Sequence, residues 1–321
     1  MDVSVIIVNW NTKDSLKACL ASVYRQTRGI HFEVIVVDNA STDDSVPMVR
    51  ADFAQVILIA NSENKGFAAA NNQGLAIATG RYVLLLNSDT LICDDAISKS
   101  VAYADQHPKA AVVGCQVWED EQTVQMTCFR FPSLLNLVLS VFGLSKILKT
   151  NRFFGRERML WWKRDEERQV DVVSGMFMLV NKRAIEQVGL MSEDYFLYFE
   201  ETDWCYRFAR AGWKSLFWPG AKIVHMHGGS HSTRQAALEM FIHQQKSLLI
   251  FLKKHKGRFQ SGVGRLLLIG AVGLRMSGWL LSLMLKTIRR RKVDSEWQAV
   301  QKHWATFKFH TTGLEPNKSM R

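Results

Sequence analysis

The first ninety residues alternate between short apolar runs and segments with helical spacing, which restricts the chain to few folds. Val3–Val8 is a β-branched run of the kind buried in parallel sheets, and apolar residues recur at helical spacing in Asp14–Tyr24. The same order then repeats, with strands expected at Phe32–Val37, Val56–Ala60 and Tyr82–Leu86, a short helix after Asp43 and a helix at Gly66–Ala78. This βαβαβαβ order predicts an α/β fold with a mostly parallel, twisted sheet flanked by helices.

A polar cluster follows each of these strands. The clusters are Asn9-Trp10-Asn11, Asp38-Asn39, Asn61–Asn64 and Asn87-Ser88-Asp89. Ligands of open α/β sheets bind outside the carboxyl ends of the strands. The sequence therefore predicts one binding site at this edge of the sheet.

The cluster at Asp38 and Asn39 has two interpretations of about equal weight. A carboxylate and an amide at a strand end can pair with the N–H and carbonyl groups of a nucleobase. The same residues can also form an Asx-turn that caps the next helix.

Asp89 is a candidate metal ligand. A diphosphate leaving group needs its charge neutralised, usually by Mg²⁺ or Mn²⁺ held by one or two carboxylates and by phosphate oxygens. Further along the chain, His225 and His227 stand beside glycines, where a histidine can reach a metal or a phosphate. We expect at most one of the two to be a ligand and prefer His227.

Three carboxylates, Glu200, Glu201 and Asp203, crowd a segment rich in aromatic residues. Burial and like charge both raise carboxyl pKa values, which suits a general base that works near neutral pH. The alternative is a solvated helix N-terminus, where acidic residues are favoured in any case. The density of aromatic residues favours a cleft.

Taken in order, these motifs resemble the family 2 glycosyltransferases of the GT-A fold, especially their bacterial rhamnosyltransferase-like branch. The resemblance covers roughly residues 1–235. It rests on Val3–Asn11, Val37–Asp43, Asn64–Asn72, Leu85–Thr90, Ser174-Gly175, Phe199–Cys205 and Ala211–Trp213.

The resemblance implies a role for each matching position. Asp38 would bind the nucleobase, Asn9 and Asn11 would line the nucleotide site with Asn39, and Lys65 and Gly66 would belong to a loop over the donor. Asn87, Ser88 and Asp89 fall on the metal motif, where Asn87 replaces the family's first Asp. Asp89 would bind the metal, and Asn87 and Ser88 would bind the donor. Glu201 falls on the catalytic base and is one methylene longer than the usual Asp; Glu200 and Asp203 lie beside it, Asp203 as a possible substitute.

The implied reaction is a single inverting displacement on a nucleotide-sugar, with Mg²⁺ or Mn²⁺ as cofactor. The first choice of donor is dTDP-rhamnose, and galactofuranose, glucose and N-acetylated donors remain open. Similar enzymes act on polyprenyl-diphosphate carriers, so the expected acceptor is a lipid-linked saccharide in cell-surface polysaccharide biosynthesis.

From about residue 234 the sequence becomes helical and basic, so we expect a catalytic domain at 1–235 and a membrane-associating region at 236–321. The net charge is +11, and eleven Lys or Arg with no Asp or Glu lie between Lys253 and Lys292. Leu266–Leu285 is long enough to span a bilayer, but both of its flanks are basic, which favours an in-plane helix or a shallow hairpin. Leu134–Lys149 has an amphipathic stripe and is a second candidate, with an ordinary amphipathic helix that covers the sheet as the alternative.

The expected location is cytoplasmic and peripheral, on the inner face of the plasma membrane. The five widely spaced cysteines contain no CxxC pair, and no secretory signal pattern opens the chain, both of which favour a reducing compartment. The expected partners are the nucleotide-sugar, the lipid-linked acceptor and an anionic membrane surface.

Three other functions compete with this interpretation. A sugar nucleotidyltransferase usually carries a Gly- and Arg-containing loop after the first strand, where this chain has Asn9–Thr12. A nucleic-acid-binding protein is disfavoured because the basic stretch is apolar and no recognition motif is present. An inactive glycosyltransferase-like scaffold remains possible because of Asn87 and Glu201.

Overall fold

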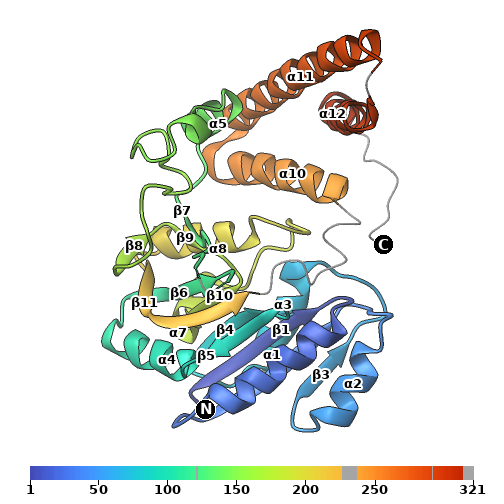
Figure 1. Cartoon of the computed structure of the whole chain (residues 1–321). Helices are drawn as coiled ribbons and strands as arrows, with labels where there is room; N and C mark the ends of the chain where they lie inside the picture. Colours follow the sequence, from blue (N-terminus) through green and yellow to red (C-terminus); the bar gives the residue numbers. More distant parts are fainter. Residues whose placement is uncertain (121, 226–236, 291, 314–321) are drawn as a thin grey trace. The chain divides into compact units, whose positions relative to one another are not determined.

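The computed structural model describes residues 1–120, 122–225, 237–290 and 292–313. The chain divides into two compact units (Figure 1). Unit 1 comprises Met1–Phe131 and Arg156–Gln235, and unit 2 comprises Pro132–Gly155 and Ala236–Arg321. The segment 132–155 is therefore grouped with the C-terminal region, whereas the sequence predicts a catalytic range of 1–235 that includes it. The functional division between 1–235 and 236–321 stays a prediction.

Unit 1 is built on the predicted sheet. Its order is β3-β2-β1-β4-β10-β6-β11-β5, with β8 paired to β11. The strands are β1 (Val3–Asn9), β2 (Phe32–Asp38), β3 (Ile57–Ala60), β4 (Tyr82–Asn87), β5 (Thr90–Cys93), β6 (Ala110–Trp118), β8 (Arg168–Val170), β10 (Phe177–Asn181) and β11 (Lys214–His225). Strands β1 to β4 pair in parallel, whereas β10 is antiparallel to both of its neighbours, so the sheet is mixed.

Helices cover both faces of this sheet. Neighbouring side chains of a strand point to opposite faces, so a strand that is apolar throughout needs helices on both sides to bury it. Val3, Val5 and Ile7 of β1 belong to the apolar cluster that also contains residues of α1, α2 and α4. Ile6 belongs to a second cluster, with residues of α3, α7 and α8. The helices are α1 (Lys13–Gln26), α2 (Ser45–Asp52), α3 (Phe67–Ile77), α4 (Ala96–Gln106), α7 (Lys182–Val188) and α8 (Glu200–Arg210).

The apolar run Val170–Val180, whose composition predicts a single strand, is divided among three strands in the structure. β8 ends at Val170, the two-residue β9 (Val172–Val173) pairs with β7 (Cys128–Phe129) in a separate small sheet, and β10 follows. Ser174 and Gly175 lie between β9 and β10, which lets the chain change partners within one apolar run.

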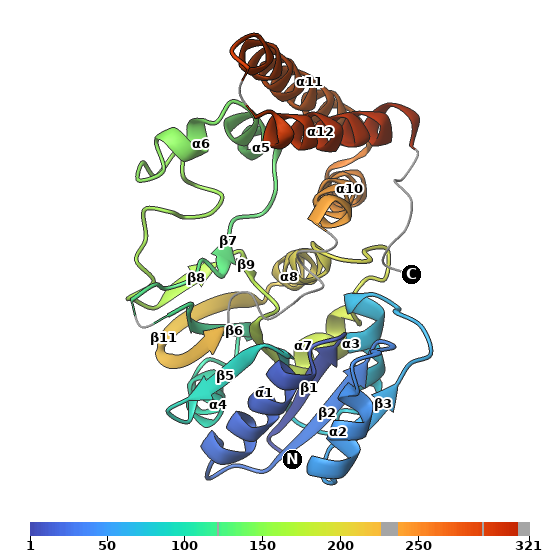
Figure 2. The same cartoon turned by 45° about the vertical axis from the view of Figure 1, so that its right-hand side comes forward.

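Unit 2 is helical. Its elements are α5 (Leu134–Val141), α6 (Leu144–Ile147), α10 (Ala237–Lys256), α11 (Arg258–Ile288) and α12 (Asp294–Thr312). α11 contacts α5, α10 and α12 (Figure 2). The single helix expected at Leu134–Lys149 is interrupted at Gly143, whose φ of 71° lies in the left-handed region that ends helices.

Candidate active site

The predicted donor-site residues at the ends of β1 and β2 form one buried hydrogen-bond network. Parallel pairing puts Asn9 opposite Asp38. The Asn9 amide nitrogen donates to Asp38 Oδ1 at 2.9 Å and to Ser41 Oγ at 3.1 Å. Thr12 Oγ1 donates to Asn9 Oδ1 at 2.6 Å and lies 2.9 Å from Ser88 Oγ. Strands β1, β2 and β4 are thus connected by polar side chains at the expected edge of the sheet.

The loop after β2 contains the Asx-turn that was one of the two interpretations of Asp38. The Ser41 N–H donates to Asp38 Oδ2 at 2.8 Å. Asp38 does not cap α2, because the residue before that helix is Asp44 and its side chain makes no capping bond. Asn11 joins the same loop, since its Oδ1 accepts from the Thr42 N–H at 2.7 Å. The turn holds the Asp38 carboxylate at the sheet edge, a position that suits a donor site as well.

The segment around Gly66 connects the donor-site residues to the acidic segment. The Asn39 amide donates to the Gly66 carbonyl at 3.2 Å, and the Phe67 N–H donates to the Phe196 carbonyl at 3.1 Å. Gly66 has a φ of 83°, and a Cβ there would lie 2.7 Å from the Phe196 carbonyl oxygen. Only glycine fits this close approach without strain. Lys65, beside it, is exposed.

The next contact joins Asp89 to a histidine. β5 pairs antiparallel with β11, and this register places Thr90 opposite His225. Asp89 precedes Thr90, and its Oδ1 lies 3.0 Å from His225 Nε2; both side chains are largely buried. Asn87 contributes its backbone carbonyl, which accepts from the Thr90 hydroxyl at 2.7 Å.

Asp89 and His225 fit the chemistry of a divalent metal site. Carboxylate oxygen and imidazole nitrogen are both ligands of Mn²⁺, and phosphate oxygens and water complete such sites in nucleotide-dependent enzymes. No group of three or more His, Cys, Asp or Glu that could hold a metal occurs among the residues that the structure describes. His227, the predicted ligand, lies outside the described residues, so its role stays a prediction.

Glu200 and Glu201 begin α8, where Glu200 is buried and Glu201 is half-buried. Glu200 is 3% exposed, and neither Glu200 Oε2 nor Glu201 Oε2 has a hydrogen-bond partner. Burial, and next the neighbouring Glu201 charge, raise the pKa of the Glu200 carboxyl well above its ordinary value. Burial also raises the pKa of the Glu201 carboxyl. The structure therefore does not support the alternative interpretation, in which these carboxylates are solvated at a helix N-terminus.

Asp203 has a different environment from the two glutamates. It is fully buried, and its Oδ2 accepts from Arg207 Nε at 2.7 Å while Tyr195 Oη donates to its Oδ1 at 3.3 Å. Its role as a substitute base stays a prediction, but its Oδ2 is engaged by the Arg207 guanidinium. This contact favours a positioning role.

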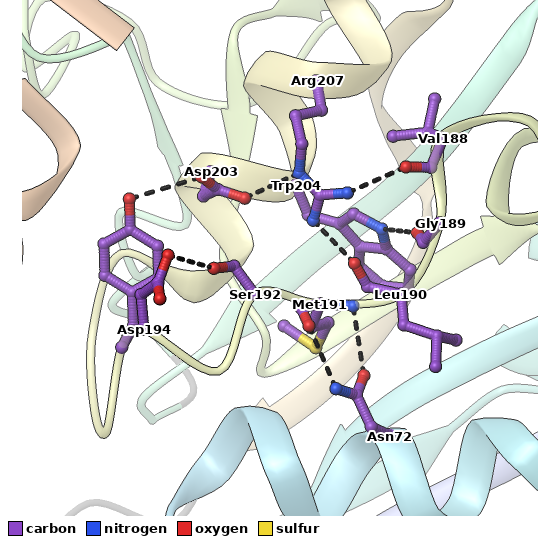
Figure 3. Close-up of polar contacts among 11 residues, drawn as sticks. Asn72, Val188, Gly189, Leu190, Met191, Ser192, Asp194, Asp203, Trp204 and Arg207 are labelled. Carbon is purple, nitrogen blue, oxygen red and sulfur yellow. Dashed lines mark hydrogen bonds and ion pairs between the residues drawn. The ribbon is translucent and has the colours of Figure 1, made fainter. Parts of the chain in front are cut away.

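The structure adds positioning residues that the sequence analysis missed (Figure 3). Arg207 donates to the carbonyls of Val188 and Leu190, and Trp204 Nε1 donates to the Gly189 carbonyl at 2.8 Å. Asn72 of α3 exchanges two hydrogen bonds with the backbone of Met191, at 3.0 and 3.1 Å. The segment before the two glutamates is thus fixed from two helices.

Asn72 and Trp204 lie within motifs of the family resemblance, but a spacing that predicts the contact itself exists only for Arg207. Arg207 stands four residues after Asp203, which is the spacing of an ion pair on one helix face. Asn72 carried no such signal, because its partner Met191 is far away in the sequence.

The mixed sheet with helices on both faces has the GT-A fold of glycosyltransferases. The mannosyltransferase PcManGT from Pyrobaculum calidifontis, solved in complex with GDP-Man and Mn²⁺, has a similar fold, with a TM-score of 0.54 over 98% of this chain and 88% of that one. The two sequences are 18% identical, so this likeness concerns the fold.

The chain belongs to glycosyl transferase family 2, whose model matches residues 4–188. An N-acetylglucosaminyl-diphospho-decaprenol L-rhamnosyltransferase of Mycobacterium tuberculosis is 26% identical over 90% of this chain and 96% of its own length. The UDP-Glc:alpha-D-GlcNAc-diphosphoundecaprenol beta-1,3-glucosyltransferase WfaP of Escherichia coli is 36% identical over 32% of this chain and 41% of its own length. The predicted family and its rhamnosyltransferase-like character are confirmed.

Proposed function

We propose that this glycosyltransferase transfers rhamnose from dTDP-rhamnose to a lipid-linked saccharide with inversion, in cell-surface polysaccharide biosynthesis. The observation that carries the proposal is the similarity to the mycobacterial rhamnosyltransferase, which extends over 90% of this chain and 96% of that protein. Both relatives named above act, by their names, on sugars attached to a polyprenyl diphosphate. Their similarity supports an acceptor of that class.

The donor would lie against the network at the ends of β1, β2 and β4. Asp38, held by Asn9 and by its Asx-turn, would accept from a nucleobase N–H, because its oxygens keep further lone pairs for a ligand. Asn11, Asn39, Asn87 and Ser88 would line the same site. Lys65, which is exposed beside Gly66, would neutralise phosphate charge.

Glu201 would be the general base. It would take the proton of the acceptor hydroxyl while that oxygen forms a bond to the anomeric carbon, and the bond to the nucleoside diphosphate breaks on the opposite side. The raised pKa of the Glu201 carboxyl brings it closer to the pH at which proton transfer is efficient.

A divalent cation, Mg²⁺ or Mn²⁺, would be held by Asp89, by His225 or His227, and by the donor's diphosphate. When bound, it would neutralise charge on the leaving group. Asp89 and His225 supply two suitable ligand atoms 3.0 Å apart, which supports the assignment. The solved mannosyltransferase contains Mn²⁺, which also supports a divalent cation here.

The enzyme would work in the cytoplasm, at the inner face of the plasma membrane, where a lipid-linked acceptor is presented. Within the described residues, one helix, α11, is long and apolar enough to cross a membrane by length and composition, which alone is weak evidence of membrane association.

The first test is a thermal-shift panel of nucleotide-sugars and nucleoside diphosphates, with and without Mn²⁺ or Mg²⁺. We expect dTDP-rhamnose and dTDP to raise Tm, and metal to increase the shift, because ligands that bind only the folded state stabilise it. Stabilisation by another donor alone would refute the choice of rhamnose. If no donor shifts Tm and none is consumed, the chain is an inactive scaffold.

A further inference from the structure

Part of α11 presents large apolar side chains to solvent. Leu274, Leu281 and Ile288 are spaced by seven residues and therefore share one face, and they are 67%, 54% and 70% exposed. Leu285 follows Leu281 by one helical turn, so it lies on the same face, and it is also exposed. Soluble surfaces rarely expose a contiguous apolar stripe of this kind, and where they do the stripe marks an interaction site.

A shallow hollow along the C-terminal half of α11 combines apolar and cationic groups. Leu281 and Leu285 line it together with the small residues Gly278 and Ser282, and Lys286 and Arg289 complete its lining. Apolar side chains next to cations match the boundary between acyl chains and anionic headgroups. The charge pattern agrees, since no acidic residue occurs between Lys253 and Lys292.

α12 argues against a spanning orientation of α11. It packs against α11, and Glu296 of α12 forms an ion pair with Lys286 at 2.5 Å. α12 also contacts α10, since the ring of His310 in α12 lies 2.5 Å from Oε1 of Gln245 in α10. If α11 crossed the bilayer, these contacts would place α12 in the bilayer as well.

The charges on α12 would then be costly. Glu296, Lys302 and Lys308 belong to this helix, and a charged residue at the bilayer centre costs about 2.5–3.5 kcal/mol on insertion scales. Arg275 in the middle of α11 would add a further charge. The exposed Trp297 and Trp304, again seven residues apart, are instead typical of the membrane interface.

We propose that α11 lies in the plane of an anionic bilayer, with the stripe Leu274, Leu281, Leu285 and Ile288 inserted at the headgroup level and Arg289 contacting lipid phosphate. This membrane proposal rests on the proposed function only for the location of the lipid-linked acceptor. Binding to the bilayer needs neither donor nor acceptor, so it can be measured separately from sugar transfer.

The test is co-sedimentation of the full chain with vesicles of phosphatidylcholine alone and of equal parts phosphatidylcholine and phosphatidylglycerol. We expect stronger binding to the anionic vesicles, weakened by salt, and release by alkaline carbonate. Absence of binding, or retention in carbonate as a spanning helix would show, overturns the proposal.

The variant Leu281→Asp/Leu285→Asp should lower binding to anionic vesicles at least about tenfold, because two apolar side chains leave the insertion face. The matched control is Ile57→Asp/Ile77→Asp, which changes two similarly exposed residues of unit 1 and should bind as the wild type does. Equal binding by the α11 variant and this control contradicts the proposal.

A second variant tests the proposal in case the double substitution impairs folding. Arg289→Gln removes one surface charge and should lower binding to anionic vesicles about fivefold while leaving binding to neutral vesicles unchanged. An equal effect on both kinds of vesicle, or none on either, argues against headgroup contact. If vesicle binding fails while sugar is still transferred to a soluble acceptor analogue, only the membrane proposal falls.

Discussion

Both units bury some polar side chains, but they differ in the size of their apolar clusters and in how many large apolar side chains they expose. Unit 1 buries polar groups, among them Asn9, Asp38, Glu200 and Asp203, inside a molecule whose apolar side chains form two large clusters. Unit 2 has one small buried cluster, centred on Leu137, Leu249 and Leu268. Most of the exposed large apolar side chains in the described part of the chain belong to it.

This difference indicates two kinds of function. Burying a polar group is unfavourable unless it is hydrogen-bonded, so a fold that keeps several of them at one edge holds them in place for a ligand. Exposing apolar side chains is unfavourable unless a partner covers them. Variants in one unit should therefore leave the property of the other unit intact, and the predictions below test that separation.

The largest effect is expected for Glu201→Gln. This change removes the proposed base while keeping shape, and should lower kcat by about 10²–10⁴-fold because that is the contribution of a general base. Donor-induced thermal shifts and vesicle binding should stay as in the wild type. The control is Glu186→Gln on α7, an exposed glutamate; wild-type transfer by Glu201→Gln would exclude it as the base.

A smaller loss is expected for Asp89→Asn and His225→Ala. If these side chains hold the cation, each variant should need at least about tenfold more Mn²⁺ for half-maximal activity. Metal titrations at fixed donor concentration measure this. An unchanged titration for His225→Ala, with a shifted one for a His227→Ala variant, would assign the ligand to His227 and leave His225 as a partner of Asp89.

Asn72→Ala tests positioning within unit 1. The variant leaves backbone groups of Met191 without their partners and should lower the stability of the unit by about 1–3 kcal/mol. Because it touches the segment before Glu200, kcat should fall while KM for the donor changes little. Gln187→Ala, which loses one exposed contact to Trp213, is the control. A rise in KM alone would place Asn72 in donor binding.

The smallest effect concerns Glu200, where stability depends on pH. Its pKa is raised on folding, so the folded state binds a proton more tightly than the unfolded one, and stability falls as pH rises above the ordinary value of 4.5. Glu200→Gln removes this loss. Its Tm should exceed that of the wild type at neutral pH, by an amount that shrinks as the pH approaches 4.5. Equal Tm curves would show that the Glu200 carboxyl is not perturbed.

The first ninety residues could be predicted from the sequence because the information there is local. A β-branched run followed by a helical period specifies a strand and a helix, and short crossovers align the strand ends, so that Asn9 and Asp38 come out opposite each other. The acidic segment at Glu200 and Glu201 was also evident from composition, as was the basic and apolar character of α11.

Other features depended on pairing between distant segments, which local patterns do not encode. The register of β5 against β11 places Asp89 beside His225, although more than one hundred residues separate them. The contacts of Asn72 with Met191, and of Arg207 with Asp203 and two carbonyls, fix the segment that leads to Glu200. The sequence determined which residue types were present at the sheet edge and on α11. Only the tertiary structure decided which of them meet, because strand register and helix packing are set by contacts between segments far apart in the chain.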